Sequence, residues 1–101
     1  MKQFVEVHYI VKDGMRDAFY RAILSRGIAA ASRAEAGNEK YDYYLSPDNG
    51  NELLLIELWA SAEAVRAHSE APHFKALGEL KQEYVTETVI MRYDVADPAC
   101  R

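Results

Sequence analysis

The sequence predicts an α+β domain whose elements follow the order strand, helix, strand, strand, helix, strand. Short runs rich in β-branched and aromatic residues alternate with two longer amphipathic stretches. A strong turn signal separates only the two middle runs. The chain has 101 residues, which fits a single domain over 1–101, and half of its residues are hydrophobic. This composition is typical of a folded globular protein.

The first strand is predicted over 4–11, where Glu6 and His8 alternate with apolar and aromatic residues. Both faces of this strand are largely apolar. A strand with one face in water would show a cleaner polar side, so we expect both faces to be covered.

The first helix is expected to begin at Asp13 as N-cap and to stop at Gly37 as its C′ residue. An apolar stripe with helical spacing follows Asp13 and includes Met15 and Phe19, which are interpreted as core. Gly27 is expected to loosen this helix without ending it.

A hairpin follows the helix. Its strands are predicted over 40–46 and 53–59, and residues 47–50, with the sequence Pro-Asp-Asn-Gly, form the turn. The second of these strands is nearly continuous in Leu and Ile, which favours a central position in the sheet.

The last third of the chain is predicted to contain a helix, a further helical turn and a strand. Ser61 is a good N-cap for a helix over 62–70, and Pro72 suits the first position of a new helix. The final strand is predicted over 85–95, and 95–101 form a polar tail.

This order of elements is the ferredoxin-like βαββαβ arrangement, a four-stranded antiparallel sheet with helices on one face. The other face of the sheet would expose Tyr, Val and Leu side chains as an oversized apolar patch. We therefore expect a homodimer in which two sheets pack face to face and close a dimeric α+β barrel.

Charge and cysteine content exclude several classes of protein. The net charge is −4, and Lys and Arg are scattered, which argues against binding to nucleic acid. No apolar run approaches the roughly 20 residues of a membrane span, and the first residues do not resemble a secretory leader. Cys100 is the single cysteine and has no partner for an internal disulfide, which indicates a cytoplasmic protein.

A motif around the second helical region resembles the antibiotic biosynthesis monooxygenase (ABM) family. The resemblance covers nearly the whole chain, and its specific part is the His-x-x-x-Pro-His-Phe-Lys segment. The residues that carry it are Glu57-Leu58-Trp59, Ser61, Ala67-His68, Ala71-Pro72-His73-Phe74-Lys75 and, before the first helix, Lys12-Asp13-Gly14. The resemblance implies a dimeric α+β barrel with an apolar pocket between sheet and helices in each subunit.

The family resemblance does not choose among activities. Some members oxygenate quinols or polyketide phenols without a cofactor, some open haem, and one branch isomerises a phosphorylated quorum-signal sugar. The haem-degrading members use an Asn, a Trp and a His at positions where this chain has Val7, His68 and Gly78. The resemblance therefore favours the quinol-monooxygenase-like or phospho-autoinducer-isomerase-like branch and argues against haem degradation.

His68 and His73 are the candidate catalytic residues, because imidazole exchanges protons near neutral pH. They lie five residues apart across Pro72, and both could point back toward the sheet. The alternative is that they bind backbone groups where the two helices meet. No metal is expected, because the three histidines lack a short-range ligand spacing.

Five further residues are candidates for binding a substrate. Glu57 follows a run of Leu and Ile and could be a buried base, although a salt bridge or an exposed strand end is the simpler interpretation. Trp59 shares its strand face and is interpreted first as core. Tyr41 and Tyr43 are expected to face the helices, and Phe74 belongs to the motif.

Together with the family resemblance, these residues lead to the hypothesis of a monooxygenase that needs no cofactor, acts on a small electron-rich aromatic compound such as a quinol, and uses O₂. The first alternative is an isomerase that moves a proton on a small metabolite through the histidines. The second is a dimeric binding or stress protein without catalysis, which would have a filled core.

Overall fold

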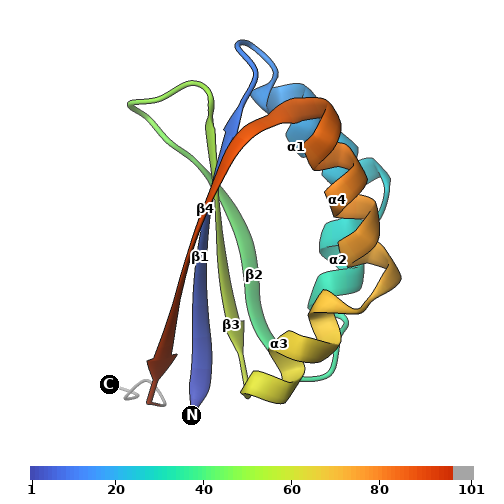
Figure 1. The fold of residues 1–101 in the computed structure, drawn as a ribbon, viewed down its shortest axis with the longest axis vertical. Helices are drawn as coiled ribbons and strands as arrows, with labels where there is room; N and C mark the ends of the chain where they lie inside the picture. The colour runs from blue at the N-terminus through green and yellow to red at the C-terminus, as the bar shows by residue number, and fades with distance from the viewer. Residues whose placement is uncertain (97–101) are drawn as a thin grey trace.

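The computed structural model describes residues 1–96, and its element order is drawn in Figure 1. The strands are β1 (Lys2–Val11), β2 (Asn38–Leu45), β3 (Glu52–Trp59) and β4 (Val85–Val95). The helices are α1 (Arg16–Ser25), α2 (Ile28–Arg33), α3 (Ala62–Ser69) and α4 (Pro72–Tyr84). Cys100 and most of the predicted tail lie outside the described residues.

The four strands form one antiparallel sheet in the order β2-β3-β1-β4, so β3 and β1 are central. The predicted ferredoxin-like fold class is confirmed. The register places Val5 of β1 between Glu57 of β3 and Arg92 of β4, and it places Tyr41 of β2 opposite Glu57. Since side chains directly opposite one another share a face, these four residues form one row across the sheet.

All helices lie on one face of the sheet, as Figure 1 shows. Alternate residues of β1 and β3 are buried beneath them, as the period of two in these strands requires. Phe19 of α1 is fully buried between Tyr9 and Tyr84, with ring centroids 5.5 Å and 5.8 Å away. Burial of a Phe side chain contributes roughly 1.5–3 kcal/mol.

The predicted first helix is divided in two at Gly27. This residue has φ 71°, in the left-handed region that glycine adopts without strain, and its carbonyl starts α2 by accepting from Ala31 N. Met15 lies at the N-cap position of α1 and is only partly buried, so its assignment to the core is wrong.

Two predicted helix ends are also wrong. Asp13 does not cap α1; its carboxylate accepts a hydrogen bond from Asn51 Nδ2 at 3.1 Å. Gly37 is not the C′ residue, because α2 ends earlier. Instead, Gly37 has φ 87°, and a Cβ there would lie 2.7 Å from Ala64 Cβ. A glycine at this position therefore lets the loop that carries Glu35 pack closely against α3.

The junction between α3 and α4 agrees with its sequence signals. Ser61 Oγ accepts a hydrogen bond from Ala64 N at 3.2 Å, and Pro72 occupies the first turn of α4. Ala71 N donates to the carbonyl of His68 at 3.1 Å, which closes the link between the two helices. The junction brings the side chains of His68 and His73 near each other.

The outer face of the sheet carries no helix. Its side chains are the alternate residues of each strand that point away from the core. They are Phe4, Glu6, His8 and Ile10 of β1, Lys40, Asp42 and Tyr44 of β2, Glu52, Leu54, Ile56 and Leu58 of β3, and Glu87, Val89, Met91 and Tyr93 of β4. Within residues 1–96, no helix has both the length and the apolar character needed to cross a membrane.

Candidate functional site

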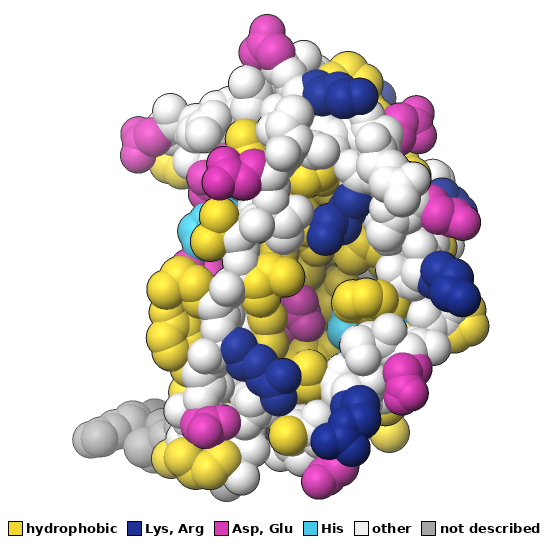
Figure 2. Space-filling view, in the orientation of Figure 1, with side chains coloured by type: hydrophobic (Ala, Val, Ile, Leu, Met, Phe, Trp, Pro, Cys, Tyr) yellow, Lys and Arg dark blue, Asp and Glu magenta, His cyan; other side chains and the backbone are white. Residues whose placement is uncertain are grey.

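A cavity of about 220 Å³ lies between the inner face of the sheet and helices α3 and α4. Figure 2 looks into it: the hollow has mostly apolar walls, with an acidic and a histidine side chain visible inside. The lining residues are Val5, Val7, Tyr9, Tyr41, Glu57, Val65, His68, Ser69, Phe74, Leu77, Gly78, Lys81, Ile90 and Arg92. The strands supply the inner wall, and α3, α4 and the edge strand β4 surround the mouth.

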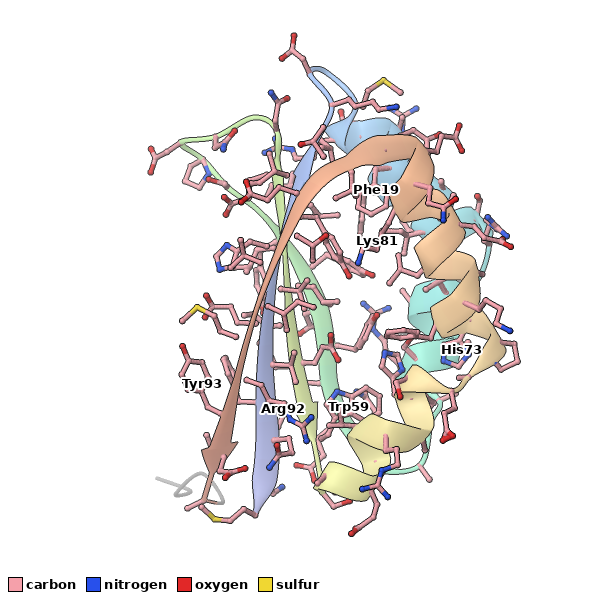
Figure 3. All side chains as sticks on the ribbon, in the orientation of Figure 1. Phe19, Trp59, His73, Lys81, Arg92 and Tyr93 are labelled. Carbon is pink, nitrogen blue, oxygen red and sulfur yellow. The ribbon has the colours of Figure 1, made fainter. Side chains whose placement is uncertain are left out.

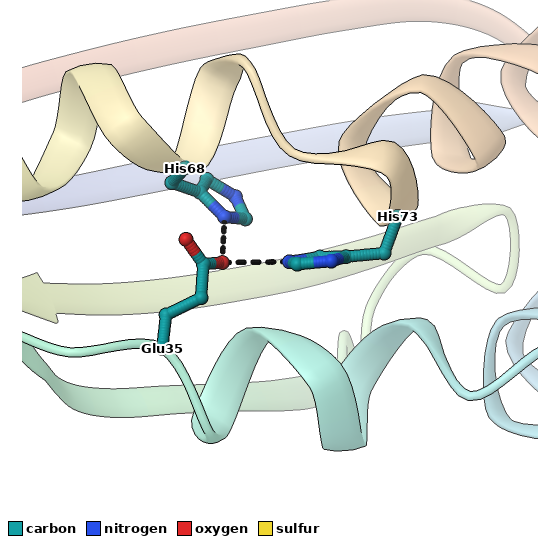
Figure 4. Close-up of side chains that lie close together, drawn as sticks. All are labelled: Glu35, His68 and His73. Atoms are coloured by element: carbon teal, nitrogen blue, oxygen red, sulfur yellow. Dashed lines mark hydrogen bonds and ion pairs between the residues drawn. The ribbon is translucent and has the colours of Figure 1, made fainter.

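A hydrogen-bonded triad lies at one wall of the cavity (Figure 4). His68 Nδ1 lies 2.5 Å from Glu35 Oε2, and His73 Nε2 lies 2.7 Å from the same oxygen. Since a carboxylate only accepts, both imidazoles donate to it. The contact therefore assigns the proton of neutral His68 to Nδ1 and leaves Nε2 free to accept a proton. Among residues 1–96, both imidazoles bond to the Glu35 carboxylate and neither bonds to a backbone group, so the alternative interpretation of the two histidines is wrong.

His68 is buried among aromatic rings. Its ring centroid lies 4.7 Å from that of Trp59, 5.7 Å from Tyr41 and 5.3 Å from Phe74. Burial lowers the pKa of His68 below its usual 6.5, although the hydrogen bond and the charge of Glu35 act in the opposite direction. His68 is thus a neutral base at pH 7, with a carboxylate placed to stabilise its protonated form.

The same triad is the set of described residues that could hold a metal ion, because the three ligand atoms lie within 4.8 Å of one another. Zinc binds imidazole nitrogen at about 2.0–2.1 Å, so tetrahedral ligand atoms around it are about 3.3 Å apart. The distances of 2.5 Å and 2.7 Å here are those of hydrogen bonds. A metal would have to move Glu35 from between the two imidazoles and replace both shared protons.

Glu57 is buried on β3 at the inner wall. Its Oε1 accepts a hydrogen bond from Trp59 Nε1 at 2.8 Å, and no cation among residues 1–96 pairs with it. Desolvation raises the pKa of Glu57 to about 7, and the Trp59 bond opposes this shift. The expectation that Glu57 forms a salt bridge or lies exposed is therefore wrong, because the strand continues beneath the helices as far as Trp59.

Three tyrosines lie in or beside the cavity. Tyr41 lines it, and burial raises the pKa of this phenol to about 12. Tyr43 stacks edge-on against Tyr41 behind the wall, and the hydroxyls of both residues are enclosed without a hydrogen bond of normal geometry to the described residues. Tyr9 also lines the cavity, and burial raises its pKa well above the usual 10.0. All three phenols are protonated at neutral pH.

Two cations line the cavity at its mouth. Lys81 extends from α4 with its Nζ 5.7 Å from the centre of the Tyr9 ring, and Arg92 projects from β4. Figure 3 shows both side chains reaching into the space between helices and sheet. Within residues 1–96, neither forms an ion pair with a carboxylate.

Sequence reasoning identified part of this site. The cavity is lined by His68, Tyr41, Glu57 and Phe74, whereas the remaining predicted site residues, His73, Trp59 and Tyr43, are not among its lining residues. Figure 3 shows Trp59 next to α3 and His73 at the start of α4. Trp59 is fully buried, in agreement with its first interpretation as core.

Other site residues were missed. Glu35 lies in a loop, and its only sequence signal is a short Ala-Glu-Ala-Gly stretch. Lys81 and Arg92 resemble the other scattered cations, and only the register of β4 and the packing of α4 bring them to the cavity. Val7 and Gly78, which were compared with haem-degrading proteins, also line it.

Comparison with known proteins agrees with the motif. Residues 3–80 match the family described as antibiotic biosynthesis monooxygenase, which is well over half of the chain. The chain belongs to this family. The positions in the match include Glu35, Glu57, His68 and His73, so the triad and the buried carboxylate lie inside the family domain.

Individual relatives support this assignment. The protein named "Putative monooxygenase Rv0793" from Mycobacterium tuberculosis is 39% identical over 80 residues, which are 75% of this chain and 77% of that protein. Its solved structure has a TM-score of 0.85 and covers 99% of this chain and 100% of its own. "Putative monooxygenase YcnE" from Bacillus subtilis is 28% identical over 71 residues, 70% of this chain and 73% of its own. A solved structure from Caulobacter crescentus, at 23% identity, has the same fold with a TM-score of 0.86, covering 95% of this chain and 91% of its own.

Proposed function

We propose that this ABM-family protein is a monooxygenase that needs no cofactor and oxidises a small electron-rich aromatic compound such as a hydroquinone. The observation that carries the proposal is a buried imidazole, His68, which lines an apolar cavity and is held by Glu35 through Nδ1. The family supports the same reaction class. A volume of about 220 Å³ is below the roughly 300–1,000 Å³ of pockets for drug-sized ligands, which favours a single-ring substrate.

In the proposed reaction, His68 is the general base. Its Nε2 accepts a phenolic proton, and Glu35 stabilises the imidazolium. The phenolate passes one electron to O₂, and the resulting radical pair combines at a ring carbon to form a peroxide. The proton returns from His68 to the peroxide, and loss of water leaves a carbonyl at that carbon. Hydroquinone plus O₂ thus gives hydroxyquinone plus water, and no external reductant is needed.

The rest of the cavity supports this chemistry. Its apolar walls exclude water, which strengthens electrostatic interactions inside and limits leakage of reduced oxygen. Tyr9 keeps its proton at neutral pH and makes no hydrogen bond to a described residue, so it can donate one to a developing oxyanion. Tyr41 contributes a ring to the wall, and Phe74 lies half-exposed at the mouth.

We further propose that the working unit is a homodimer in which two outer faces pack together. Several large apolar side chains on this face are more than 40% exposed in the single subunit, namely Tyr44, Val89, Met91 and Tyr93. A patch of this kind in a monomer of 11.5 kDa would favour association. The alternating apolar residues of β1 and β3 continue the patch across the centre of the sheet.

A second candidate function is an isomerase that moves a proton on a small anionic metabolite. The observation that favours it is the pair of cations, Lys81 and Arg92, at the cavity mouth. His68 would then move a proton between adjacent carbons without O₂. A binding protein without catalysis has less support, because the cavity leaves the interior unfilled.

An oxygen electrode distinguishes these functions. We expect oxygen uptake with at least one member of a hydroquinone panel, with one O₂ consumed per hydroxyquinone formed and an unchanged rate after dialysis against EDTA. Absence of uptake across the panel would contradict the monooxygenase. Exchange of substrate C–H protons with D₂O in an NMR tube, without uptake, would favour the isomerase instead.

A further inference from the structure

We infer that the cavity selects an anionic substrate: a small aromatic compound with a hydroxyl group at the inner end and a carboxylate at the mouth that Arg92 binds, with Lys81 as a second cation of the cavity lining. The inference rests on the proposed function only in taking this cavity as the substrate site. It adds a charge requirement that a neutral hydroquinone does not meet.

The two cations approach the cavity from separate elements. Lys81 belongs to α4 and Arg92 to β4, and Figure 3 shows their side chains extending toward each other's layer. In Figure 2, basic side chains lie on both sides of the hollow. Since neither cation pairs with a carboxylate of residues 1–96, both are available to a ligand.

Arg92 is held in place by a buried side chain. Its Nε donates to Gln3 Oε1 at 2.7 Å, and Gln3 is only 5% exposed. Gln3 is fixed in turn by donating to Asp94 Oδ1 at 2.5 Å. This arrangement leaves both Nη groups of Arg92 without a partner among the described residues. A guanidinium presented in this way binds a carboxylate through two parallel hydrogen bonds.

The spacing of the polar groups sets the length of the ligand. Arg92 and Glu57 lie in one row of the sheet with Val5 between them. Neighbouring strands are about 4.8 Å apart, so the backbones of these two residues are about 10 Å apart. Apolar side chains of Val5, Val7 and Leu77 line the space between. A single aromatic ring with polar groups at opposite ends fits this pattern.

The charge of the whole chain makes the mouth distinctive. The net charge is −4, so an anion is repelled by most of the surface. Two cations that have no carboxylate partner among residues 1–96 line this low-dielectric cavity, and such an arrangement favours anions there. A carboxylate at the mouth also keeps its charge away from Glu57, whereas an anion at the inner end would meet that buried acid.

Isothermal titration with matched probes tests the inference. We expect the full chain at pH 7.5 to bind 4-hydroxybenzoate about tenfold more tightly than 4-hydroxybenzamide, which has the same shape without the charge. Arg92→Gln should remove most of this preference and Arg92→Lys should retain part of it. Lys81→Gln should reduce the preference less than Arg92→Gln, because Lys81 lies beside Tyr9 and not in the row of Arg92. Lys75→Gln is the matched control, because Lys75 is an exposed cation of α4 outside the cavity lining.

Several outcomes would overturn the inference. Equal affinity for the two probes, no binding of either, or a preference that survives Arg92→Gln each contradicts it. Tighter binding of phenyl phosphate than of 4-hydroxybenzoate contradicts the choice of a carboxylate. Oxygen uptake is measured separately: a charge preference without uptake contradicts the proposed function alone, and uptake of neutral hydroquinones without a charge preference contradicts this inference alone.

Discussion

The two faces of the sheet give ionisable side chains opposite environments, although the same strands build both faces. Ionisable groups are desolvated on the inner face and paired with opposite charges on the outer face. On the inner face, Glu57 has no cation partner among residues 1–96, and desolvation is the main cause of its raised pKa. On the outer face, His8 lies between two carboxylates, with Nε2 2.5 Å from Glu6 and Nδ1 3.1 Å from Glu52. Hydrogen bonds to Glu6 and then Glu52 raise the pKa of His8, whereas burial lowers that of His68.

This difference in pairing distinguishes two kinds of ionisable group. Groups that are paired with an opposite charge contribute to the fold, whereas buried groups without such a partner can react with a ligand. Paired outer residues, which also include Lys40 and Asp42 at 3.2 Å, satisfy one another at the surface. A buried group such as Glu57 costs stability, and such a cost is typical of functional sites. We therefore propose catalysis for the inner face and assembly for the outer face, and substitutions on each face test the two proposals.

The largest expected effect is on turnover. His68→Gln should lower kcat by about 10²–10⁴-fold, the usual loss for a positioned base, because Gln accepts no proton near pH 7. The matched control is His8→Gln on the outer face, which should leave kcat near the wild-type value. His73→Gln should have an intermediate effect, since His73 reaches the cavity only through Glu35.

The pH profile sharpens this prediction. The wild-type rate should rise with pH through a pKa below 6.5, because burial holds the pKa of His68 below that value. His68→Gln should remove this dependence. Wild-type turnover in His68→Gln, or an equal loss in His8→Gln, would contradict the assignment of His68 as base.

The next effect is on assembly. Ile56→Lys places a charge in the centre of the outer face, where Glu6 and Asp42 are its cross-strand neighbours and can pair with it in the single subunit. We expect light scattering to give a dimer for the wild type and a folded monomer of about 11.5 kDa for the variant. Leu24→Lys, at a 45% exposed position of α1, is the control and should remain dimeric. A monomeric wild type would contradict the proposed dimer.

The sequence predicted the fold because local patterns determine it. Alternation marks the strands, the Pro-Asp-Asn-Gly turn joins β2 to β3, and Ser61 with Pro72 define the helix junction. The errors at Asp13 and Gly37 arose because these residues also fit roles in loop contacts, which sequence spacing cannot distinguish from capping.

The site was less predictable because its contacts span long distances along the chain. Glu35 is 33 positions from His68, and nothing near Glu35 in sequence indicates a partner. The burial of Glu57 depends on α3 covering the end of β3, and the position of Arg92 depends on the pairing of β4 with β1. Such features follow from tertiary packing and not from local pattern.

A third prediction concerns the stability that the fold loses when the buried Glu57 becomes charged. Between its usual pKa of 4.5 and the folded value of about 7, the folded state keeps a proton that the unfolded state has released. The free energy of unfolding should therefore fall as pH rises through this window, by at most about 3–4 kcal/mol. Glu57→Gln can still accept from Trp59, so it should raise Tm at pH 8 and change it little at pH 5. An unchanged Tm at pH 8 would show that Glu57 is already solvated.

The smallest expected effect concerns His8 on the outer face, which is the counterpart of Glu57 on the inner face. The pKa of His8 is raised, so its protonated form stabilises the fold below pH 6.5, and this contribution is lost as pH rises through the folded pKa. In the dissociated subunit, where these pairs lie at the surface, His8→Gln should therefore lower stability at pH 5.5 by about 0.2–1 kcal/mol and have no effect at pH 9. Glu57→Gln acts with the opposite sign and at the opposite end of the pH range. Urea unfolding of both variants at the two pH values tests the contrast, and an equal loss for His8→Gln at both would show that His8 acts through packing and not through its charge.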